Sequence, residues 1–282
     1  MIKVLKPGFY SSIQDLGRRG YQQFGVPVSG VMDVYSAKMV NAILGNDKNT
    51  AVIEMTMTGV TLQFNCDINI CISGAEMNPM LNGIKIDLNK SVSVVKSDIL
   101  SFGKLNNGFR CYLAVSGGFQ SEVRMNSRSM FKGITNQNKL KKDDELKVVN
   151  SSETLVKHAS IRVNNTRLFS ETIDVYRGPE FDKLSASQIE TLLNSKFTIS
   201  KANNRMGYQL VEPLENDLKS IITSSVMPGT VQLTPSGKLI ILMRDCQTTG
   251  GYPRVLQLKE TSIDVLAQKF TNQTLSFKLI DY

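Results

Sequence analysis

Histidine, cysteine and long apolar runs are scarce in this chain, and each scarcity argues against particular classes of protein. The 282 residues contain one histidine, His158, and four cysteines. One histidine leaves little scope for a zinc site or a Ser-His or Cys-His catalytic pair. Four cysteines in so long a chain do not make a disulfide framework. No apolar run approaches the roughly 20 residues that cross a bilayer, and the lysine-rich start does not resemble a signal peptide. We therefore predict a cytoplasmic protein that does not enter a membrane.

Two of the cysteines, Cys66 and Cys71, lie in one stretch of alternating apolar residues that predicts a strand. Alternate side chains of a strand point to opposite faces, so Cys66 shares a face with Ile68 while Cys71 faces the other way. Two ligands on opposite faces cannot bind one metal ion. The sequence therefore predicts no metal site.

Motifs that bind nucleotides or nucleic acids are also missing. The chain has neither Gly-x-x-x-x-Gly-Lys-Ser/Thr nor a Gly-x-Gly-x-x-Gly that opens a helix. Its net charge is +8, but the basic residues are spread along the chain and aromatic residues do not interleave with them. This pattern predicts a solvated basic surface and no nucleic-acid partner. Anionic substrates remain compatible with it.

Short β-branched stretches at intervals of about ten residues predict a mainly β protein, a barrel or a sandwich. The strands expected in the first half are Thr50–Met57, Val60–Phe64, Cys66–Ile72, Ile84–Leu88, Ser91–Val95 and Cys111–Val115. A fall in apolar content near residue 150 suggests two β-rich halves, 1–150 and 151–282. The second half is expected to begin with the strands Ile161–Val163 and Ile173–Arg177.

A few short helices are predicted between the strands. Asp33 is a good N-cap for a helix that ends at Gly45. The spacing Ser187-x-x-Glu190 is that of a capping box, and a second helix start is predicted at Thr261. The segment from Gln120 to Asp144 is instead predicted to be a long polar loop.

The two halves echo each other in three short segments that occur in the same order. Arg19–Gln22 is similar to Arg205–Gln209, and Gly59–Gln63 is similar to Gly229–Leu233. In the third pair, a strand leads to Ser73-Gly74 in one half and to Thr249-Gly250-Gly251 in the other. This order predicts two related β-barrels whose glycine turns face one cleft.

The stretch from Asp245 to Arg254 concentrates polar groups at the end of a strand, Leu239–Met243, that is predicted to be buried on both faces. Gly250 and Gly251 would let the backbone turn sharply and would leave backbone N–H groups open to an anion or a polarised carbonyl. A structural hairpin in which Asp and Thr side chains cap their own backbone remains the alternative.

Many collinear motifs are similar to those of one family. They are Gln14-Asp15-Leu16-Gly17-Arg18, Gly25-Val26-Pro27, Ser29-Gly30, Met32-Asp33, Glu54-x-Thr56, Tyr112–Gly118, Ser127-Arg128-Ser129, Arg177-Gly178-Pro179, Asn204–Tyr208, Pro228-Gly229 and Asp245–Arg254. The chain resembles the family of 5-oxoprolinase C subunits, also called KipA, allophanate hydrolase subunit 2 or the biotin-dependent carboxyltransferase family. The resemblance implies a cyclophilin-like β-barrel architecture with two pseudo-duplicated halves.

The resemblance also implies a function in a complex. Together with the KipI-like B subunit and the A subunit of 5-oxoprolinase, the family hydrolyses 5-oxoproline to glutamate with ATP. Two alternatives stay open: half of a biotin-dependent carboxyltransferase acting on urea or a similar amide, and a non-catalytic KipA-like regulator that binds a kinase inhibitor. Biotin is expected only under the first alternative.

The lactam of 5-oxoproline, urea and the ureido ring of biotin all present an N–C=O group. A site for any of them must polarise the oxygen and accept or remove the N–H proton. The predicted catalytic residues are Asp245, Gln247, Thr248, Arg254 and Asp33. The predicted substrate- or anion-binding residues are Gly250, Gly251, Arg205, Arg18 and Arg128, with Asp33 and Arg205 placed across a cleft from the focal stretch. Asp245→Asn is expected to abolish turnover and to leave the fold intact.

One region departs from the family pattern. After the Ser-Arg-Ser motif, the family usually shows a Gly-Arg pair and then a Gly-Asp pair. Here residues 136–144 read Asn-Gln-Asn-Lys-Leu-Lys-Lys-Asp-Asp. We therefore expect this turn to be rebuilt and the role of the family's arginine to be changed.

Overall fold

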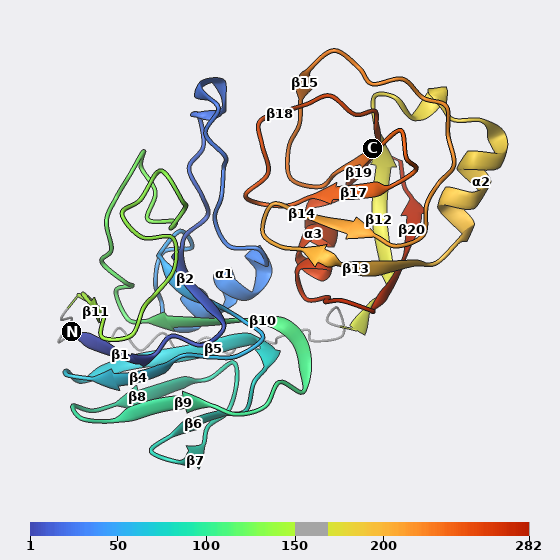
Figure 1. Cartoon of the computed structure of the whole chain (residues 1–282). Coiled ribbons are helices and arrows are strands. Elements are labelled where there is room, and N and C mark those ends of the chain that lie inside the picture. Colours follow the sequence, from blue (N-terminus) through green and yellow to red (C-terminus); the bar gives the residue numbers. More distant parts are fainter. Residues whose placement is uncertain (150–168, 282) are drawn as a thin grey trace. The chain divides into compact units, whose positions relative to one another are not determined.

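The computed structural model describes residues 1–149 and 169–281 (Figure 1). The predicted boundary at 150/151, His158 and the predicted strand Ile161–Val163 lie outside these ranges. The chain divides into two compact units. The first contains Met1–Arg18 and the described residues from Ser29 to 149, and the second contains Arg19–Val28 and the residues from Phe169 to 281.

The first unit is built from two antiparallel sheets. The six-stranded sheet has the order β11-β1-β4-β9-β6-β7, and the five-stranded sheet has the order β2-β3-β10-β5-β8. The strands are β1 (Ile2–Lys6), β2 (Tyr10–Gln14), β3 (Val52–Thr56), β4 (Thr61–Phe64), β5 (Ile68–Glu76), β6 (Pro79–Leu81), β7 (Ile84–Lys85), β8 (Ser91–Val94), β9 (Ile99–Phe102), β10 (Asn107–Val115) and β11 (Glu145–Leu146).

The main core of this unit is formed by apolar residues from both sheets. Leu62 of β4 and Leu100 of β9 come from one sheet, and Ile70, Ile72 and Leu113 come from the other. All of these side chains are almost fully buried. The alternation along β5 sends Ile70 and Ile72 into this core, as strand geometry requires.

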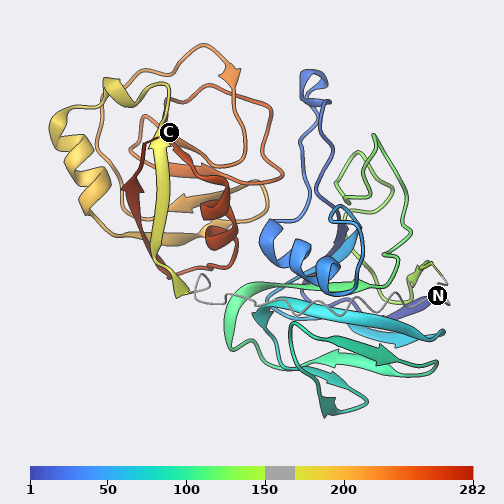
Figure 2. The ribbon, with the colours of Figure 1, turned by 180° about the vertical axis from the view of Figure 1, so that it is seen from behind.

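Helix α1 (Val34–Ile43) covers the other face of the five-stranded sheet (Figures 1 and 2). Val40 of the helix shares a second apolar cluster with Cys71 of β5 and Tyr112 of β10. The prediction that Cys71 faces away from Ile70 and Ile72 is therefore confirmed. The N-cap prediction is also confirmed, because the Asp33 side chain accepts a hydrogen bond from the Ser36 backbone N–H.

The second unit is a closed seven-stranded barrel with the order β12-β19-β16-β17-β14-β13-β20. Its strands are β12 (Thr172–Arg177), β13 (Phe197–Asn203), β14 (Gly207–Leu210), β16 (Thr230–Leu233), β17 (Leu239–Leu242), β19 (Arg254–Leu258) and β20 (Thr274–Leu279). All adjacent pairs are antiparallel except β12 and β20, which are parallel. Two short strands outside the barrel, β15 (Ser224–Ser225) and β18 (Thr249–Gly250), pair with each other.

Strand β17 is buried on both faces, as its apolar run predicts. Leu239 and Ile241 alternate into the barrel core and are fully buried. Leu242 packs on the other face against Val226 and Cys246. Because Val226 directly follows β15, the β15–β18 ribbon lies over this outer surface of the barrel.

The remaining helices begin at other residues than predicted. Helix α2 (Ala186–Asn194) has its capping box at Ser185 and Gln188, so the predicted box at Ser187 and Glu190 is wrong by two residues. Both spacings fit the pattern, and the backbone conformation of Ser185 selects the first. Helix α3 (Glu260–Ala267) begins after Lys259, whose side chain forms no cap. Two 3-10 helices, η1 (Gln22–Phe24) and η3 (Phe181–Lys183), belong to the second unit.

The prediction of a mainly β protein with a barrel is confirmed, but the echoes between the halves take different local structures. Gly74 is not a turn that ends a strand, because it lies inside β5 opposite Cys111 with a φ of 92°. A Cβ atom there would come within 2.6 Å of the Arg110 carbonyl oxygen, which explains the glycine. The echo between β4 and β16 does hold, since a glycine precedes each strand.

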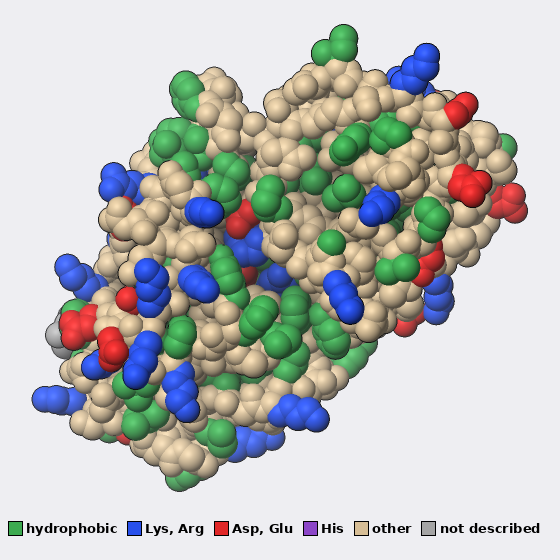
Figure 3. Space-filling view, viewed as in Figure 1, with side chains coloured by type: hydrophobic (Ala, Val, Ile, Leu, Met, Phe, Trp, Pro, Cys, Tyr) green, Lys and Arg blue, Asp and Glu red, His purple; other side chains and the backbone are tan. Residues whose placement is uncertain are grey.

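Charge is dispersed on the surface. Lysine and arginine side chains are scattered over the face shown in Figure 3 and do not gather into a stripe. Within the two described ranges, no helix is long and apolar enough to cross a membrane.

Candidate functional site

The focal stretch forms an ordered loop between β17 and β19 and not a tight hairpin. Gly250 belongs to β18 and pairs with Ser224, so the prediction that the glycine pair turns the chain sharply is wrong. The reason for glycine is close packing: a Cβ atom on Gly250 would lie 2.4 Å from Nε2 of Gln232. Gln232 is buried, and its Nε2 has no hydrogen-bond partner among the described residues.

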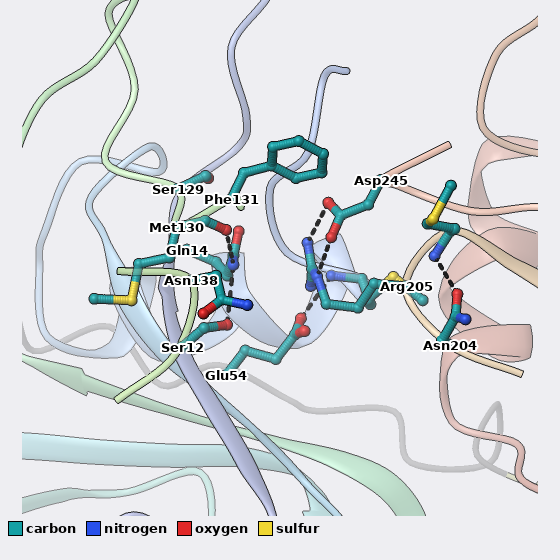
Figure 4. A network of polar contacts seen from close by, with 12 residues as sticks. Ser12, Gln14, Glu54, Ser129, Met130, Phe131, Asn138, Asn204, Arg205 and Asp245 are labelled. Carbon is teal, nitrogen blue, oxygen red and sulfur yellow. Dashed lines mark hydrogen bonds and ion pairs between the residues drawn. The ribbon is translucent and has the colours of Figure 1, made fainter. Parts of the chain in front are cut away.

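Asp245, the first residue of the focal stretch, forms a buried ion pair with Arg205 (Figure 4). Nε of Arg205 donates to Oδ2 of Asp245 at 2.8 Å, and Nη2 donates to Oδ1 at 3.0 Å. The backbone N–H of Asp245 in turn donates to the carbonyl oxygen of Arg205. This geometry is a fork of two parallel bonds, the strongest arrangement of a guanidinium and a carboxylate. The sequence predicts that Arg205 lies across a cleft from the focal stretch, but in the structure Arg205 is hydrogen-bonded directly to Asp245.

The turn that carries Arg205 is shaped by its own neighbours. Oδ1 of Asn204 accepts hydrogen bonds from the backbone N–H groups of Met206 and Gly207. This is an Asx turn, which holds the segment before β14 in one conformation. The motif Asn204–Tyr208 therefore positions the guanidinium that meets Asp245.

Arg254, the last residue of the stretch, is occupied by a partner that sequence reasoning missed. Its Nε and Nη2 donate to the two carboxylate oxygens of Glu180, each at 3.0 Å, and its Nη1 donates to the Ser225 carbonyl. The backbone N–H of Arg254 also donates to Glu180. Glu180 follows the turn Gly178-Pro179, and only the tertiary contact reveals its role. These bonds make Arg254 a brace between η3, β19 and β15.

The remaining predicted residues of the stretch differ in accessibility. Gln247 is exposed and Thr248 is partly buried. The Thr248 carbonyl accepts a hydrogen bond from the Val226 backbone. Of the predicted catalytic residues in the stretch, Gln247 is the exposed one, whereas Asp245 and Arg254 are held by their ion pairs.

The pair Glu180–Arg254 gives a prediction about pH. Hydrogen bonding from the Arg254 side chain lowers the pKa of Glu180 below its ordinary value. A depressed folded-state pKa stabilises the fold at neutral pH, and that contribution is lost as the pH falls from the unfolded-state pKa, about 4.3, through the lower folded-state pKa. In urea denaturation at a series of pH values, the advantage of the wild type over Glu180→Gln should shrink over this range. Glu190→Gln, which removes a carboxylate from an exposed helix position, is the matched control.

In the first unit, a buried polar network surrounds the predicted residue Asp33. Its two carboxylate oxygens accept from the backbone N–H and the hydroxyl of Ser36, and its backbone N–H donates to the Tyr112 hydroxyl. That hydroxyl donates to Oε2 of Glu54 at 2.8 Å, and burial raises the pKa of Tyr112 well above its ordinary value. Arg110 lies 3.9 Å from the other oxygen of Glu54. Asp33 is thus a helix cap inside this network.

Asp15 fixes the Ser127-Arg128-Ser129 motif to the start of the chain. Its Oδ1 accepts from the hydroxyls of Ser127 and Ser129, each at 2.7 Å, and from the Gly17 backbone N–H. Its Oδ2 accepts from the Arg128 backbone N–H at 2.6 Å.

The two predicted arginines of the first unit have different environments. Arg18 is fully buried and donates to the Ser129 carbonyl. Arg128 is partly buried and lines a cavity. Nearby, the amide of Gln14 donates to the Ser12 hydroxyl and to the Met130 carbonyl (Figure 4). Hydrogen bonds therefore hold the chain on both sides of Arg128.

No group of three potential metal ligands occurs in the described part of the chain, and all four cysteines are free. Burial raises the pKa of the Cys71 and Cys246 thiols to about 12, so both remain protonated at neutral pH. These thiols are packing residues and not nucleophiles.

Comparison with known proteins identifies the class. Residues 24–279 match the family described as carboxyltransferase domain, subdomain A and B. The chain belongs to this family.

Two relatives match the chain almost end to end. It is 29% identical to the C subunit of 5-oxoprolinase from Escherichia coli over 98% of this chain and 90% of that protein. It is 30% identical to the C subunit of 5-oxoprolinase from Haemophilus influenzae over 99% of this chain and 91% of that protein.

Matches to urea-processing proteins cover a small part of longer chains. The chain is 35% identical to the urea amidolyase of Saccharomyces cerevisiae over 75% of its own length and 12% of that protein. The crystal structure of Kluyveromyces lactis urea amidolyase superposes with a TM-score of 0.88 and 27% identity, covering 99% of this chain and 19% of that one.

Proposed function

We propose that the chain is the C subunit of an ATP-dependent 5-oxoprolinase, which hydrolyses 5-oxo-L-proline to L-glutamate together with the A and B subunits. The observation that carries the proposal is the end-to-end match to two proteins of that name, each covered over at least 90% of its length. In the reaction, one water adds across the lactam C–N bond to give the carboxylate and the amine of glutamate. A second water cleaves ATP to ADP and phosphate.

The proposal assigns the second unit the task of holding the lactam N–C=O group. The two bonds from Arg205 orient the carboxylate of Asp245. Asp245 would accept the lactam N–H, and the groups of Gln247 and Thr248 would donate to the lactam oxygen as charge develops on it. Arg254 is proposed as a support for this loop through Glu180.

ATP binding is assigned to the A subunit or to the interface with the B subunit, because the helix starts of this chain do not fit a triphosphate. Among the described residues, α1 begins at the Asp33 carboxylate, α2 begins with a side-chain capping box, and α3 has Glu260 in its first turn. Carboxylates and filled caps at these ends disfavour phosphate binding there. A cytoplasmic location is proposed for the complex, since four free thiols suit a reducing compartment.

A reconstitution assay tests this function. Glutamate should form from 5-oxo-L-proline and ATP only when this chain and the A and B subunits are all present. Omission of this chain should reduce the rate to the background of the other two proteins. Glutamate formation without this chain would contradict the proposal.

A second function is supported by the family itself, whose description is a carboxyltransferase domain. Under it, the chain would be half of a biotin-dependent carboxyltransferase acting on urea or a similar amide. Absence of glutamate, with transfer of carboxylate from carboxybiotin to urea, would establish this second function. Absence of both activities, with a stable complex to the KipI-like B subunit, would indicate a regulatory protein.

A further inference from the structure

The first unit contains a cavity of about 350 Å³ that the proposed lactam site does not use. This volume falls within the range of small-molecule pockets, about 300–1,000 Å³. Its wall combines apolar residues of the two sheets, Ile13 of β2 and Leu146 of β11, with polar groups of the long loop that follows β10. The cavity therefore has the mixed lining of a binding site for a small polar molecule.

Arg128 is the fixed cation of this cavity. Its Nη1 donates to the Ser121 carbonyl and its Nη2 donates to Oε1 of Gln120, while its backbone is clamped by Asp15. These two side-chain bonds use two of the five N–H donors of a guanidinium. No carboxylate of a described residue forms an ion pair with this guanidinium. The arginine is thus held in place with donors left for a ligand.

A second polar group on the wall is also unsatisfied. The hydroxyl of Ser121 is shielded from solvent and has no hydrogen-bond partner in the described part of the chain. Ser121 is adjacent to Gln120, whose amide oxygen orients Arg128. Ser121 and Arg128 therefore lie together on one wall of the cavity.

Three carboxylates, Glu122, Asp144 and Glu145, share the lining with Arg128 and Lys147, and two of the three are occupied by other groups. Glu122 accepts from Arg124 and from the Asn136 backbone, and Asp144 accepts from the Lys141 backbone and the Gln137 amide. Glu145 and Lys147 are exposed at the rim and carry opposite charges. Within the described ranges, Arg128 is the one cation of the lining that is partly buried without an ion-pair partner.

We propose that this cavity binds a small organic carboxylate that also carries a neutral amide, with Arg128 as the anchor of the carboxylate. A planar guanidinium matches a carboxylate with two parallel bonds. The side chains of Asn136 and Gln137, from segment 136–144, line the same cavity and can pair with the amide of the ligand. This segment would thus set which acid binds. This assignment of the cavity rests on the proposed function only in that 5-oxo-L-proline is chosen as the probe.

Titration calorimetry on the full chain tests the site without partner proteins or turnover. The probes are 5-oxo-L-proline, its uncharged carboxamide and inorganic phosphate. The first should bind most tightly, and Arg128→Gln should weaken it by roughly tenfold or more because a hydrogen bond to a charged group is lost. Arg19→Gln, which removes the same charge from an exposed position outside the lining, should bind as the wild type does.

A second variant covers the case in which Arg128→Gln does not fold. The Lys147 side chain is exposed at the rim, and Lys147→Glu should weaken 5-oxo-L-proline binding by roughly fivefold through charge alone, an effect that salt should reduce. Undetectable binding to the wild type, equal binding of the carboxamide or of phosphate, or full affinity in Arg128→Gln would each overturn the proposal. Because the readout is the change in affinity that Arg128→Gln causes in this chain alone, its failure is distinct from a failure of glutamate formation in the complex.

Discussion

Asp245→Asn is expected to lower the free energy of unfolding by about 3 kcal/mol and to abolish glutamate formation by the assembled complex. Both oxygens of Asp245 accept from Arg205, and both side chains are less than a tenth exposed. The asparagine side chain is neutral, and its NH2 group would face one of the two N–H donors of Arg205. The sequence-based expectation that this variant leaves the fold intact is therefore replaced by a loss of stability and turnover. Urea denaturation of the chain and the reconstitution assay measure the two effects.

A double-mutant cycle separates the ion pair from other effects of the substitution. Arg205→Gln alone should destabilise the chain by a similar amount, and the double variant should lose less than the sum of the two. Asp182→Asn is the matched control, since Asp182 is largely exposed and 3.7 Å from Arg177, and little change is expected. Additive losses in the cycle would show that Asp245 and Arg205 do not act as a pair.

Asp15→Ala is expected to destabilise the first unit by about 3 kcal/mol or more, because hydrogen bonds to a charged acceptor contribute roughly 1.5–3 kcal/mol each and do not add fully. The substitution removes the acceptor of Gly17, Ser127, Arg128 and Ser129 at once. The buried hydroxyls of Ser127 and Ser129 would lose a partner. Urea denaturation gives the loss of stability, and proteolysis of the loop after β10 gives its location.

The control for this variant is another aspartate of the same unit. Asp87 forms an exposed pair with Lys90, so Asp87→Ala should leave the denaturation midpoint close to that of the wild type. Equal midpoints for Asp15→Ala and Asp87→Ala would contradict the clamp. A further consequence of the clamp is that Asp15→Ala should also weaken binding in the cavity, since it frees the backbone of Arg128.

The regular elements were largely predictable because their signals are local. The cap at Asp33, the alternation around Cys71 and the apolar run of β17 each follow from neighbours in the sequence and are confirmed. The start of α2 was missed by two residues because Ser185 and Ser187 offer competing capping patterns. The role of Gly250 was missed because a glycine pair indicates a turn, whereas the actual requirement comes from Gln232, eighteen residues earlier in the chain.

By itself, the sequence determined the class of fold and the family, because strand periodicity and collinear motifs are properties of the order of residues. Which partner each charged residue takes was decided only by the tertiary structure. Asp245 meets Arg205, Arg254 meets Glu180, and Asp15 meets Ser127 and Ser129 across separations of 40, 74 and more than 100 residues. Such pairings depend on how strands register and how loops cross over them, and spacing along the chain carries no record of either.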